Sequence, residues 1–444
     1  MGAKFSALVE RMKLSEEGKL IFLETLNAIN LRTLLNNRIL IKDDELKFDS
    51  KTIDLKLFER FLIIGFGKAG VEMGSAIEAI FKSRSTTGVI VTNRVVSKSL
   101  ACEIIISSHP LPDQNSLLAA KKIIDLINRA SEKTLIIFLI SGGGSSLVEL
   151  PVEGISLDDL RDLNRLLVNS GATIAEINQV RKYLSQIKGG KLAGVLKKRK
   201  ALAIYLSDVN HGDVASIASG PLIPDSISQG DVLSILKKYK LEKKIPKPVL
   251  TVLKHQPSAD LSTQRSHIEH FILLENREVI AIAAQRARER GFRVEIYPDL
   301  VNEDYRKIAD HLIIQLIKLQ KKYPSEKVAL IGGGEVNCQV KSKGIGGRNQ
   351  EFVLYSASRF AAKRLPIDAA FLAMGTDGID GNSIADGAVL GSLKPGFSEQ
   401  TFLINNDSHS LIKKIGGLLV TGPSGNNVRD LYIFLASPEG WISD

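Results

Sequence analysis

The sequence predicts an α/β protein built from two α/β domains, and three observations support this fold class. The chain has 444 residues, more than a single hydrophobic core usually supports. Short apolar runs typical of β-strands alternate with segments whose apolar residues have helical spacing. Glycine-rich turns follow several of the apolar runs. This pattern indicates βαβ units with a mostly parallel sheet. The simplest architecture places two such domains on either side of a cleft, where ligands usually bind.

The first predicted domain covers residues 1–245. Its first segment, to about Asn37, has the apolar spacing of a helix. Strand patterns then follow at residues 61–64, 88–91, 103–107, 134–140 and 201–206. Two capping boxes, Ser156 with Asp159 and Thr173 with Glu176, predict helix starts between the last two of these strands.

The second predicted domain covers residues 246–444. Residues 226–266 are rich in Lys, Pro and Ser, which indicates a helix followed by an interdomain connection. Two strand-then-helix units come next, at 271–290 and 293–321. Further strands are expected at 328–331, 337–341, 370–374, 401–404, 417–421 and 431–435.

Composition excludes several classes of protein. The formal net charge of +10 includes a lysine cluster at residues 197–200, but that cluster ends a predicted helix, where cations suit the helix dipole. No aromatic residues are spaced for base stacking, so we expect no nucleic acid partner. No apolar run approaches the roughly 20 residues that span a bilayer, and no secretory signal opens the chain. Two distant cysteines fit buried thiols in a reducing compartment, so we expect the cytoplasm.

The first glycine-rich turn, Gly65 to Gly70, follows the strand at 61–64 and contains Lys68. Its Gly-x-Gly-x-x-Gly spacing also matches a dinucleotide-binding fingerprint. That interpretation requires a carboxylate after the second strand, where the sequence has Asn93 and Arg94. A lysine in such a turn instead suits phosphate oxygens during phosphoryl transfer, with Gly67 allowing close approach.

Other strand ends carry further candidate groups. Residues 141–146 (Ser-Gly-Gly-Gly-Ser-Ser) supply a turn in which backbone N–H groups can approach an anion. Asp208 follows the strand at 201–206, where it can accept a proton, bind a metal or simply cap a helix. Arg348 can bind phosphate or carboxylate with two N–H groups. In the turn at 375–381, Asp377 is a candidate Mg²⁺ ligand, with Asp386 nearby.

Together these segments resemble the glycerate 2-kinase family that has a C-terminal MOFRL domain. The resemblance runs nearly end to end, and the matching segments are GFGKAG (65–70), HPLPD (109–113), LISGGGSSL (139–147), INQVRKYLSQIKGGKLA (177–193), SIASGPLIPD (216–225), GGGEV (332–336), GGRNQEF (346–352), GTDGIDG (375–381), NNDS (405–408) and TGPSGNNVRDL (421–431).

This resemblance implies ATP- and Mg²⁺-dependent phosphorylation of D-glycerate on its 2-hydroxyl, which gives 2-phosphoglycerate and ADP. It also implies a Rossmann-like N-terminal domain, a smaller C-terminal α/β domain and an active site between them. The implied catalytic residues are Lys68, Asp208 and Arg348. We expect a monomer or homodimer. The residues expected to hold ATP are Gly67, Ser141, Gly142, Gly143, Gly144, Ser145, Gly375, Thr376 and Asp377, with Asp377 and Asp386 as the metal ligands.

The sequence departs from the family pattern in three places. Where many relatives read SDVPGDD, the chain has Asn210, His211 and Gly212 after Val209, so the shape of that loop is open. Glu303 follows Asn302 instead of glycine, and His409 stands where relatives often have tyrosine. Two other functions stay open: an NAD(P)H-dependent hydroxypyruvate reductase and a nucleotide-binding protein without turnover.

Overall fold

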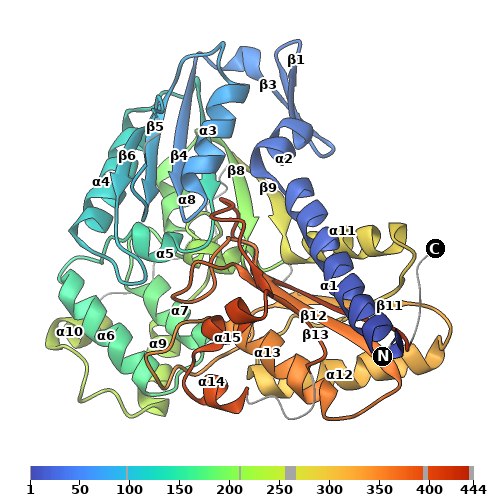
Figure 1. Cartoon of the computed structure of the whole chain (residues 1–444). Coiled ribbons are helices and arrows are strands. Elements are labelled where there is room, and N and C mark those ends of the chain that lie inside the picture. Colours follow the sequence, from blue (N-terminus) through green and yellow to red (C-terminus); the bar gives the residue numbers. More distant parts are fainter. Residues whose placement is uncertain (1, 97–98, 210–211, 256–266, 394–398, 440–444) are drawn as a thin grey trace. The chain divides into compact units, whose positions relative to one another are not determined.

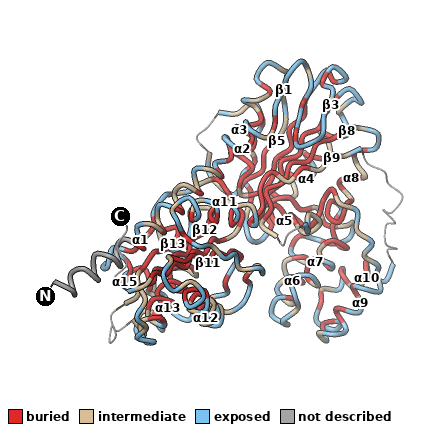
Figure 2. The backbone as a smooth tube through the Cα atoms, turned by 90° about the vertical axis from the view of Figure 1, so that its right-hand side faces the viewer, coloured by how far each residue is buried: buried red, intermediate tan, exposed pale blue. Residues whose placement is uncertain are grey.

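A computed structural model of the protein describes residues 2–96, 99–209, 212–255, 267–393 and 399–439. The chain forms two compact units. We call residues 31–273 the central unit, and residues 1–30 with 274–444 the terminal unit. Both units are α/β, as predicted, and in each the innermost strands are buried (Figure 2).

The main sheet of the central unit has six strands in the order β6-β5-β4-β7-β8-β9. The neighbours from β6 to β8 pair in parallel, which confirms the predicted parallel sheet. The strands are β4 (Arg60–Phe66), β5 (Thr86–Thr92), β6 (Glu103–Ile106), β7 (Thr134–Ile140), β8 (Lys200–Ser207) and β9 (His267–Glu275). Every residue of β7 is buried, as expected for a central parallel strand covered on both faces.

Helices and a small antiparallel sheet complete the central unit (Figure 1). The small sheet consists of β1 (Ile39–Lys42), β2 (Glu45–Phe48) and β3 (Lys51–Asp54). The helices are α2 (Leu31–Arg38), α3 (Gly70–Ile80), α4 (Gln114–Arg129), α5 (Gly144–Leu147), α6 (Leu157–Asn169), α7 (Ile174–Tyr183), α8 (Lys191–Leu196), α9 (Gln229–Lys238) and α10 (Lys247–His255), with short 3₁₀ segments η1 (Leu55–Leu57) and η2 (Val214–Ser219). Both predicted capping boxes are present, at the starts of α6 and α7.

The terminal unit has a mixed six-stranded sheet in the order β10-β11-β15-β12-β13-β14. Its strands are β10 (Arg293–Ile296), β11 (Val328–Gly334), β12 (Ile367–Gly375), β13 (Gly387–Gly391), β14 (Leu418–Leu419) and β15 (Asp430–Pro438). Its helices are α1 (Gly2–Ala28), α11 (Asn276–Glu289), α12 (Tyr305–Lys322), α13 (Arg348–Ala361), α14 (Gln400–Ile404) and α15 (Ser408–Lys414). Strand β15 runs antiparallel between β11 and β12, so its first residue lies beside their last residues.

The two units differ from the predicted division into residues 1–245 and 246–444. Helix α1 belongs to the terminal unit, where it packs along β12, β13 and α11 (Figure 1). A Cβ added at Gly18 would lie 3.4 Å from Leu435 Cδ1, so the helix approaches the sheet closely. Arg290, the residue after α11, also donates to Glu17 and Glu24 of α1, at 3.1 and 2.5 Å. The second boundary falls at 273 because β9 extends the sheet of the central unit.

Two expected strands are wrong. Residues 401–404 lie in helix α14, because a short apolar run has the same pattern in a helix and in a strand. Residues 337–341 form a loop with one bridge at Asn337. The side chain of Asn406 accepts hydrogen bonds from the backbone of this loop at Lys341 (2.7 Å) and Ser342 (3.2 Å), where a strand would have a ladder partner.

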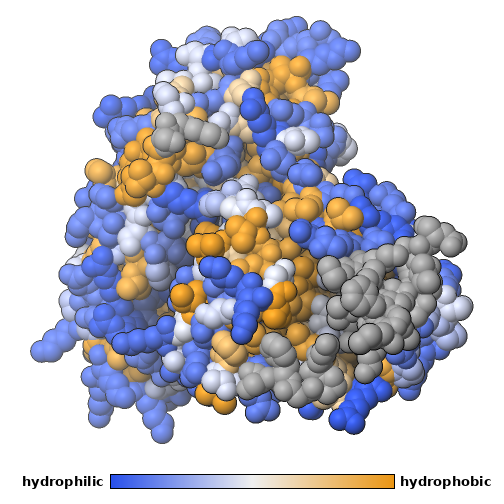
Figure 3. All heavy atoms as spheres, in the orientation of Figure 1, coloured by the Kyte–Doolittle hydropathy of each residue, from blue (hydrophilic) through white to orange (hydrophobic). Residues whose placement is uncertain are grey.

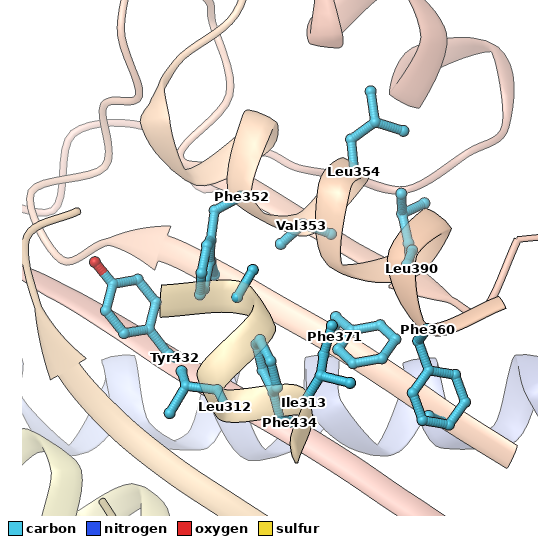
Figure 4. Close-up of a cluster of buried hydrophobic side chains, with 14 of the residues drawn as sticks. Leu312, Ile313, Phe352, Val353, Leu354, Phe360, Phe371, Leu390, Tyr432 and Phe434 are labelled. Atoms are coloured by element: carbon cyan, nitrogen blue, oxygen red, sulfur yellow. The ribbon is translucent and has the colours of Figure 1, made fainter. Parts of the chain in front are cut away.

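Aromatic side chains pack against one another within the mainly aliphatic core of the terminal unit (Figure 4). The rings of Phe371 and Phe434 meet edge to face with centroids 4.9 Å apart, and Phe352 lies 5.0 Å from Tyr432. The hydroxyl of Tyr432 points away from this cluster (Figure 4). Strand β15 therefore contributes Phe434 and the ring of Tyr432 to the core, while the Tyr432 hydroxyl faces out of the cluster.

No helix within the described ranges is long and apolar enough to cross a membrane. Hydrophilic residues cover most of the face drawn in Figure 3, and apolar residues form separate patches on it.

A buried ion pair joins Lys188 and Glu149 in the central unit, with side chains 2% and 5% exposed. Ser185 Oγ also donates to Glu149 Oε1 at 2.7 Å. Burial lowers the pKa of Lys188, and the neighbouring Glu149 carboxylate opposes that shift. The Glu149 carboxylate therefore offsets part of the free-energy cost of burying the charged Lys188 ammonium group.

We predict that Glu149→Gln lowers the free energy of unfolding by about 3 kcal/mol, because it leaves Lys188 buried without a counter-charge. Urea denaturation followed by circular dichroism measures this loss. Glu59→Gln is the matched control, because Glu59 pairs with Lys133 at the surface. An equal, small effect of both substitutions would show that the buried pair does not stabilise the fold.

Candidate active site

In the central unit, the glycine turns after β4 and β7 lie against each other. The two strands pair in parallel with Phe66 opposite Ile140, so both chains leave the sheet at the same edge. Gly67 has φ +129°, and an added Cβ would lie 2.1 Å from Ser141 Oγ, so only glycine fits there. The backbone N–H of Lys68 donates to Gly142 O at 2.9 Å, and that of Ala69 donates to Ser141 Oγ at 3.0 Å. The structure therefore brings two of the predicted turns together.

Lys68 shares this edge with His109, a residue to which the sequence assigned no role. A Cβ added at Gly143 would lie 3.3 Å from Lys68 Cγ and 3.2 Å from His109 Cδ2, so both side chains pack over this glycine. Burial, and secondly the charge of Lys68, lower the pKa of His109. His109 is thus a neutral hydrogen-bonding group beside a lysine at neutral pH. The family-matching segment HPLPD, which begins with His109, is the feature of the sequence that could have pointed to this residue.

Two serines of the 141–146 turn have structural partners. Ser141 Oγ accepts from Ala69 as described, and Ser145 Oγ lies 2.9 Å from Ser219 Oγ. A Cβ added at Gly144 would lie 2.9 Å from Ala218 Cβ, so this glycine serves close packing against η2. The hydroxyls therefore shape the turn, and the backbone is the part suited to an anion.

Asp208 follows the last residue of β8, next to β7 in the sheet. Its position at the carboxyl edge matches the prediction, and it is half-buried. Asn210 and His211, two of the residues that depart from the family pattern, lie outside the described residues. The central unit therefore contributes Lys68, His109 and Asp208 from turns along one edge of the sheet.

In the terminal unit, Arg348 is fixed by two carboxylates. Its Nε and one terminal nitrogen donate to the two oxygens of Asp430, at 2.6 and 2.9 Å, and the other terminal nitrogen donates to Glu335 at 2.5 Å. The Asp430 side chain is fully buried, whereas that of Arg348 is 34% exposed. Burial acts to lower the pKa of Arg348, but Asp430 and Glu335 outweigh it and the pKa is raised. A guanidinium has five N–H donors, so two remain beyond these three bonds.

Asp430 occupies a special place in the sheet. As the first residue of β15 it lies opposite Gly334, the last residue of β11, and Gly375, the last residue of β12. Tyr432 Oη lies 3.3 Å from Asp430 Oδ2 and accepts from the Val336 backbone N–H at 3.1 Å. Asp430 and Glu335 were not singled out from the sequence, although both fall in segments that match the family (VRDL and GGGEV).

Asp380 caps helix α13. Its two oxygens accept from the backbone N–H groups of Asn349 and Gln350, at 3.0 and 2.9 Å, and from Gln350 Nε2 at 2.9 Å. This carboxylate therefore occupies the helix N-terminus that an anionic ligand would otherwise use. Burial raises the pKa of Asp380 from 3.8 to about 6.

The other residues of the 375–381 turn are partly structural. Thr376 Oγ1 donates to Arg429 O at 2.6 Å and accepts from Val428 N–H at 3.1 Å, so it ties the turn to the loop before β15. Gly375 N–H donates to Asp386 O at 2.9 Å, and Asp377 Oδ1 accepts from Ile379 N–H at 3.1 Å. Thr376 thus supports the turn through its hydroxyl.

One of the two carboxylate oxygens of Asp386 is placed so that it could bind a cation. Its Oδ2 accepts from the backbone N–H and the hydroxyl of Thr421, whereas its Oδ1 is buried without a hydrogen-bond partner among the described residues. Burial raises the pKa of Asp386, and the nearby charge of Asp377 raises it further. The described residues contain no group of three acidic, His or Cys side chains arranged for a metal. A site here would therefore hold Mg²⁺ through one or two carboxylates plus phosphate oxygens, the usual mode for this ion.

We predict that the titration of Asp380 makes the protein less stable as the pH rises from about 4 to 6. The folded protein keeps this proton up to about pH 6, and the unfolded chain loses it near 3.8. The unfolded state binds fewer protons over that range, so the free energy of unfolding falls, by about 3 kcal/mol. Urea denaturation at several pH values should show that Asp380→Asn lacks this part of the slope. The exposed control Asp162→Asn should keep it, and identical slopes in all three proteins would contradict the assignment.

Comparison with known proteins places the chain in a family. Residues 18–254 match the model described as "Domain of unknown function (DUF4147)", and residues 328–430 match the MOFRL family. The chain is 37% identical to the D-glycerate 2-kinase of Thermotoga maritima over 85% of its own length and 91% of that protein. It is 34% identical to the glycerate 2-kinase of Pyrococcus horikoshii over 96% of its own length and 98% of that protein.

A solved structure leads to the same family. The crystal structure of the glycerate kinase from Thermotoga maritima superposes with a TM-score of 0.80, with 32% identity, over 96% of this chain and 99% of that one. The match extends over both units, so it includes the segments that contain Lys68 and Arg348. The chain therefore belongs to the glycerate 2-kinase family, in which a DUF4147 domain precedes a MOFRL domain.

Proposed function

We propose that the protein is a glycerate 2-kinase, which transfers the γ-phosphoryl group of ATP to the 2-hydroxyl of D-glycerate and releases ADP. The observation that carries this proposal is the alignment with two glycerate 2-kinases across most of the chain. The chemistry of the strand-end turns supports it, because phosphoryl transfer needs positioned cations and a group that orients the attacking hydroxyl.

Lys68 and Arg348 are the proposed cations. Lys68 lies in a turn and its own backbone N–H donates to Gly142 O. The guanidinium of Arg348 is held by hydrogen bonds to Asp430 and Glu335. A fixed cation stabilises charge that develops in the transition state without reorganising. We assign to these two residues the neutralisation of the transferring phosphoryl group and the orientation of the glycerate carboxylate.

Asp208 is the proposed partner of the 2-hydroxyl. It lies at the carboxyl edge of the parallel sheet, where α/β proteins usually place catalytic groups. A carboxylate there orients the hydroxyl and accepts its proton as the phosphorus–oxygen bond forms. His109 is a neutral hydrogen-bonding group near Lys68 that can orient a phosphate or carboxylate oxygen.

The glycine turns at 142–146 and 375–381 are the proposed cradle for the ATP phosphates. Asp377 and Asp386 are the proposed ligands of Mg²⁺. The buried Oδ1 of Asp386, which has no hydrogen-bond partner within the described part of the chain, supports this assignment. When bound, the ion would neutralise charge on the phosphate oxygens. We also propose a cytoplasmic location, because both cysteines are free thiols, and a monomeric or dimeric state.

The reductase alternative is weaker on two grounds. Strand β5 ends at Thr92, and Asn93 and Arg94 follow it without the carboxylate that would bind a nicotinamide ribose. The relatives described above are kinases by name. A nucleotide-binding protein without turnover is weaker too, because Lys68, Asp208 and Arg348 are all present.

A coupled assay of ADP release with D-glycerate, L-glycerate and glycerol tests the proposal. We expect turnover with D-glycerate that needs Mg²⁺, and phosphorus NMR should identify 2-phosphoglycerate as the product. Oxidation of NADH or NADPH by hydroxypyruvate without ADP release would establish the reductase instead. Nucleotide binding with neither reaction would show that the protein binds nucleotide without turnover.

We predict that Lys68→Ala and Arg348→Ala each lower kcat by at least ~100-fold, because each removes a positioned charge from the transition state. Steady-state kinetics measures the loss, and circular dichroism checks that the variants fold. Lys82→Ala and Arg359→Ala are the matched controls, since Lys82 is exposed and Arg359 pairs with Asp310 at the surface. Turnover near the wild-type value in either active-site variant would remove that residue from the mechanism.

A further inference from the structure

A pocket of about 490 Å³ lies within the terminal unit, next to Arg348. Its lining combines polar groups from Glu335, Arg348, Glu351 and Asn406 with apolar surface from Val336 and Val340. This volume and this mixture are typical of sites for organic ligands larger than a three-carbon acid. From this lining, the mechanism proposed above uses Arg348, its support Glu335, and Gly381 of the phosphate turn.

The walls of the pocket are held in place by hydrogen bonds. Asn406 Oδ1 accepts from the backbone N–H groups of Lys341 and Ser342, and Asn382 Oδ1 accepts from that of Gly346 at 2.9 Å. A Cβ added at Gly344 would lie 2.3 Å from Asn405 O, so this loop sits tightly on the segment before α15. The pocket is therefore built before any ligand arrives, which reduces the entropic cost of binding.

The charge of the lining argues against a small carboxylate as the ligand. Glu351 accepts from Asn406 Nδ2 at 3.0 Å and from Tyr305 Oη at 3.1 Å. The lining carries two carboxyl groups, those of Glu335 and Glu351, against the single guanidinium of Arg348. The lining therefore offers acceptors and apolar contacts to its ligand more than net positive charge. A neutral group with hydroxyl donors and an apolar face fits these features.

We infer that this pocket binds the nucleoside part of the phosphate donor, an inference that rests on the proposed kinase function. Glu335, whose side chain is 48% exposed, accepts hydrogen bonds from the sugar hydroxyls. The base packs against Val336, Cys338 and Val340. The phosphate tail leaves the pocket past Arg348 and Gly381, and Gly381 is the last residue of the proposed phosphate turn.

Protection of Cys338 from mixed-disulfide formation with a thiol reagent tests this inference without relying on activity. Cys338 lines the pocket, whereas Cys102 is buried in the central unit and serves as an internal control. Burial raises the pKa of the Cys338 thiol to about 12, so a small neutral methanethiosulfonate reagent is used at pH 9 and followed by peptide mass spectrometry.

We expect saturating adenosine or ATP to slow the modification of Cys338 at least fivefold and to leave Cys102 unchanged. D-Glycerate alone should give no protection. Unchanged modification with adenosine and ATP would overturn the inference. Protection by ATP but not by adenosine would overturn it too, because the phosphates would then occupy the pocket. Protection by D-glycerate would assign the pocket to the acid instead.

A substitution at the pocket wall gives a second readout. Val340→Trp introduces an indole into the pocket, and Val168→Trp on α6 of the central unit is the matched control, since both valines are exposed. We expect Val340→Trp to raise the Kd for adenosine and the KM for ATP at least tenfold, with the KM for D-glycerate within twofold of wild type. Unchanged nucleotide constants would overturn the inference while leaving the kinase proposal intact. Adenosine binding in a protein without glycerate turnover would support the pocket and reject the kinase.

Discussion

The ion pair between Arg348 and Asp430 is the interaction on which the polar site of the terminal unit depends. Asp430 starts β15 between the final glycines of β11 and β12, where it is fully buried. A carboxylate in that position is tolerable only if a cation and hydrogen bonds compensate for its desolvation. Arg348 supplies the charge through two N–H groups, and Tyr432 lies within 3.3 Å of the same carboxylate. In return, Asp430 fixes the guanidinium at the end of the sheet.

The central unit fixes its cation by a different means. Among the described residues, no carboxylate pairs with Lys68 in the way that Asp430 pairs with Arg348. The backbone of Lys68 is instead anchored to the neighbouring turn. The close approach of Gly67 to Ser141 brings the turns of β4 and β7 together, and Gly143 lets Lys68 and His109 pack above it. Each unit therefore uses glycines at strand ends to bring a cation and its supports together. In the terminal unit those glycines flank Asp430, and in the central unit they lie in the turn itself.

The sequence predicts the parts of this arrangement that depend on local pattern. Alternating apolar runs predict the parallel strands around β4 and β7, and glycine turns after them predict the position of Lys68. The order of the motifs also predicts the family. The pairing of Arg348 with Asp430 is not predictable in this way, because 82 residues separate the two and only the antiparallel insertion of β15 brings them together. In the sequence, Asp380 is only one residue of the glycine-rich turn at 375–381, and only the structure shows it as the cap of α13. Helix α1 has an ordinary helical pattern, which does not tell which sheet it covers.

A double-mutant cycle between Asp430 and Arg348, read out as kcat for D-glycerate phosphorylation, tests most directly whether the carboxylate acts by holding the guanidinium. If it does, Asp430→Asn lowers kcat in the wild-type background and adds almost nothing when Arg348→Ala is already present. Multiplication of the two effects in the double variant, with all three variants folded, would contradict the account, because Asp430 would then act on the reaction independently of Arg348.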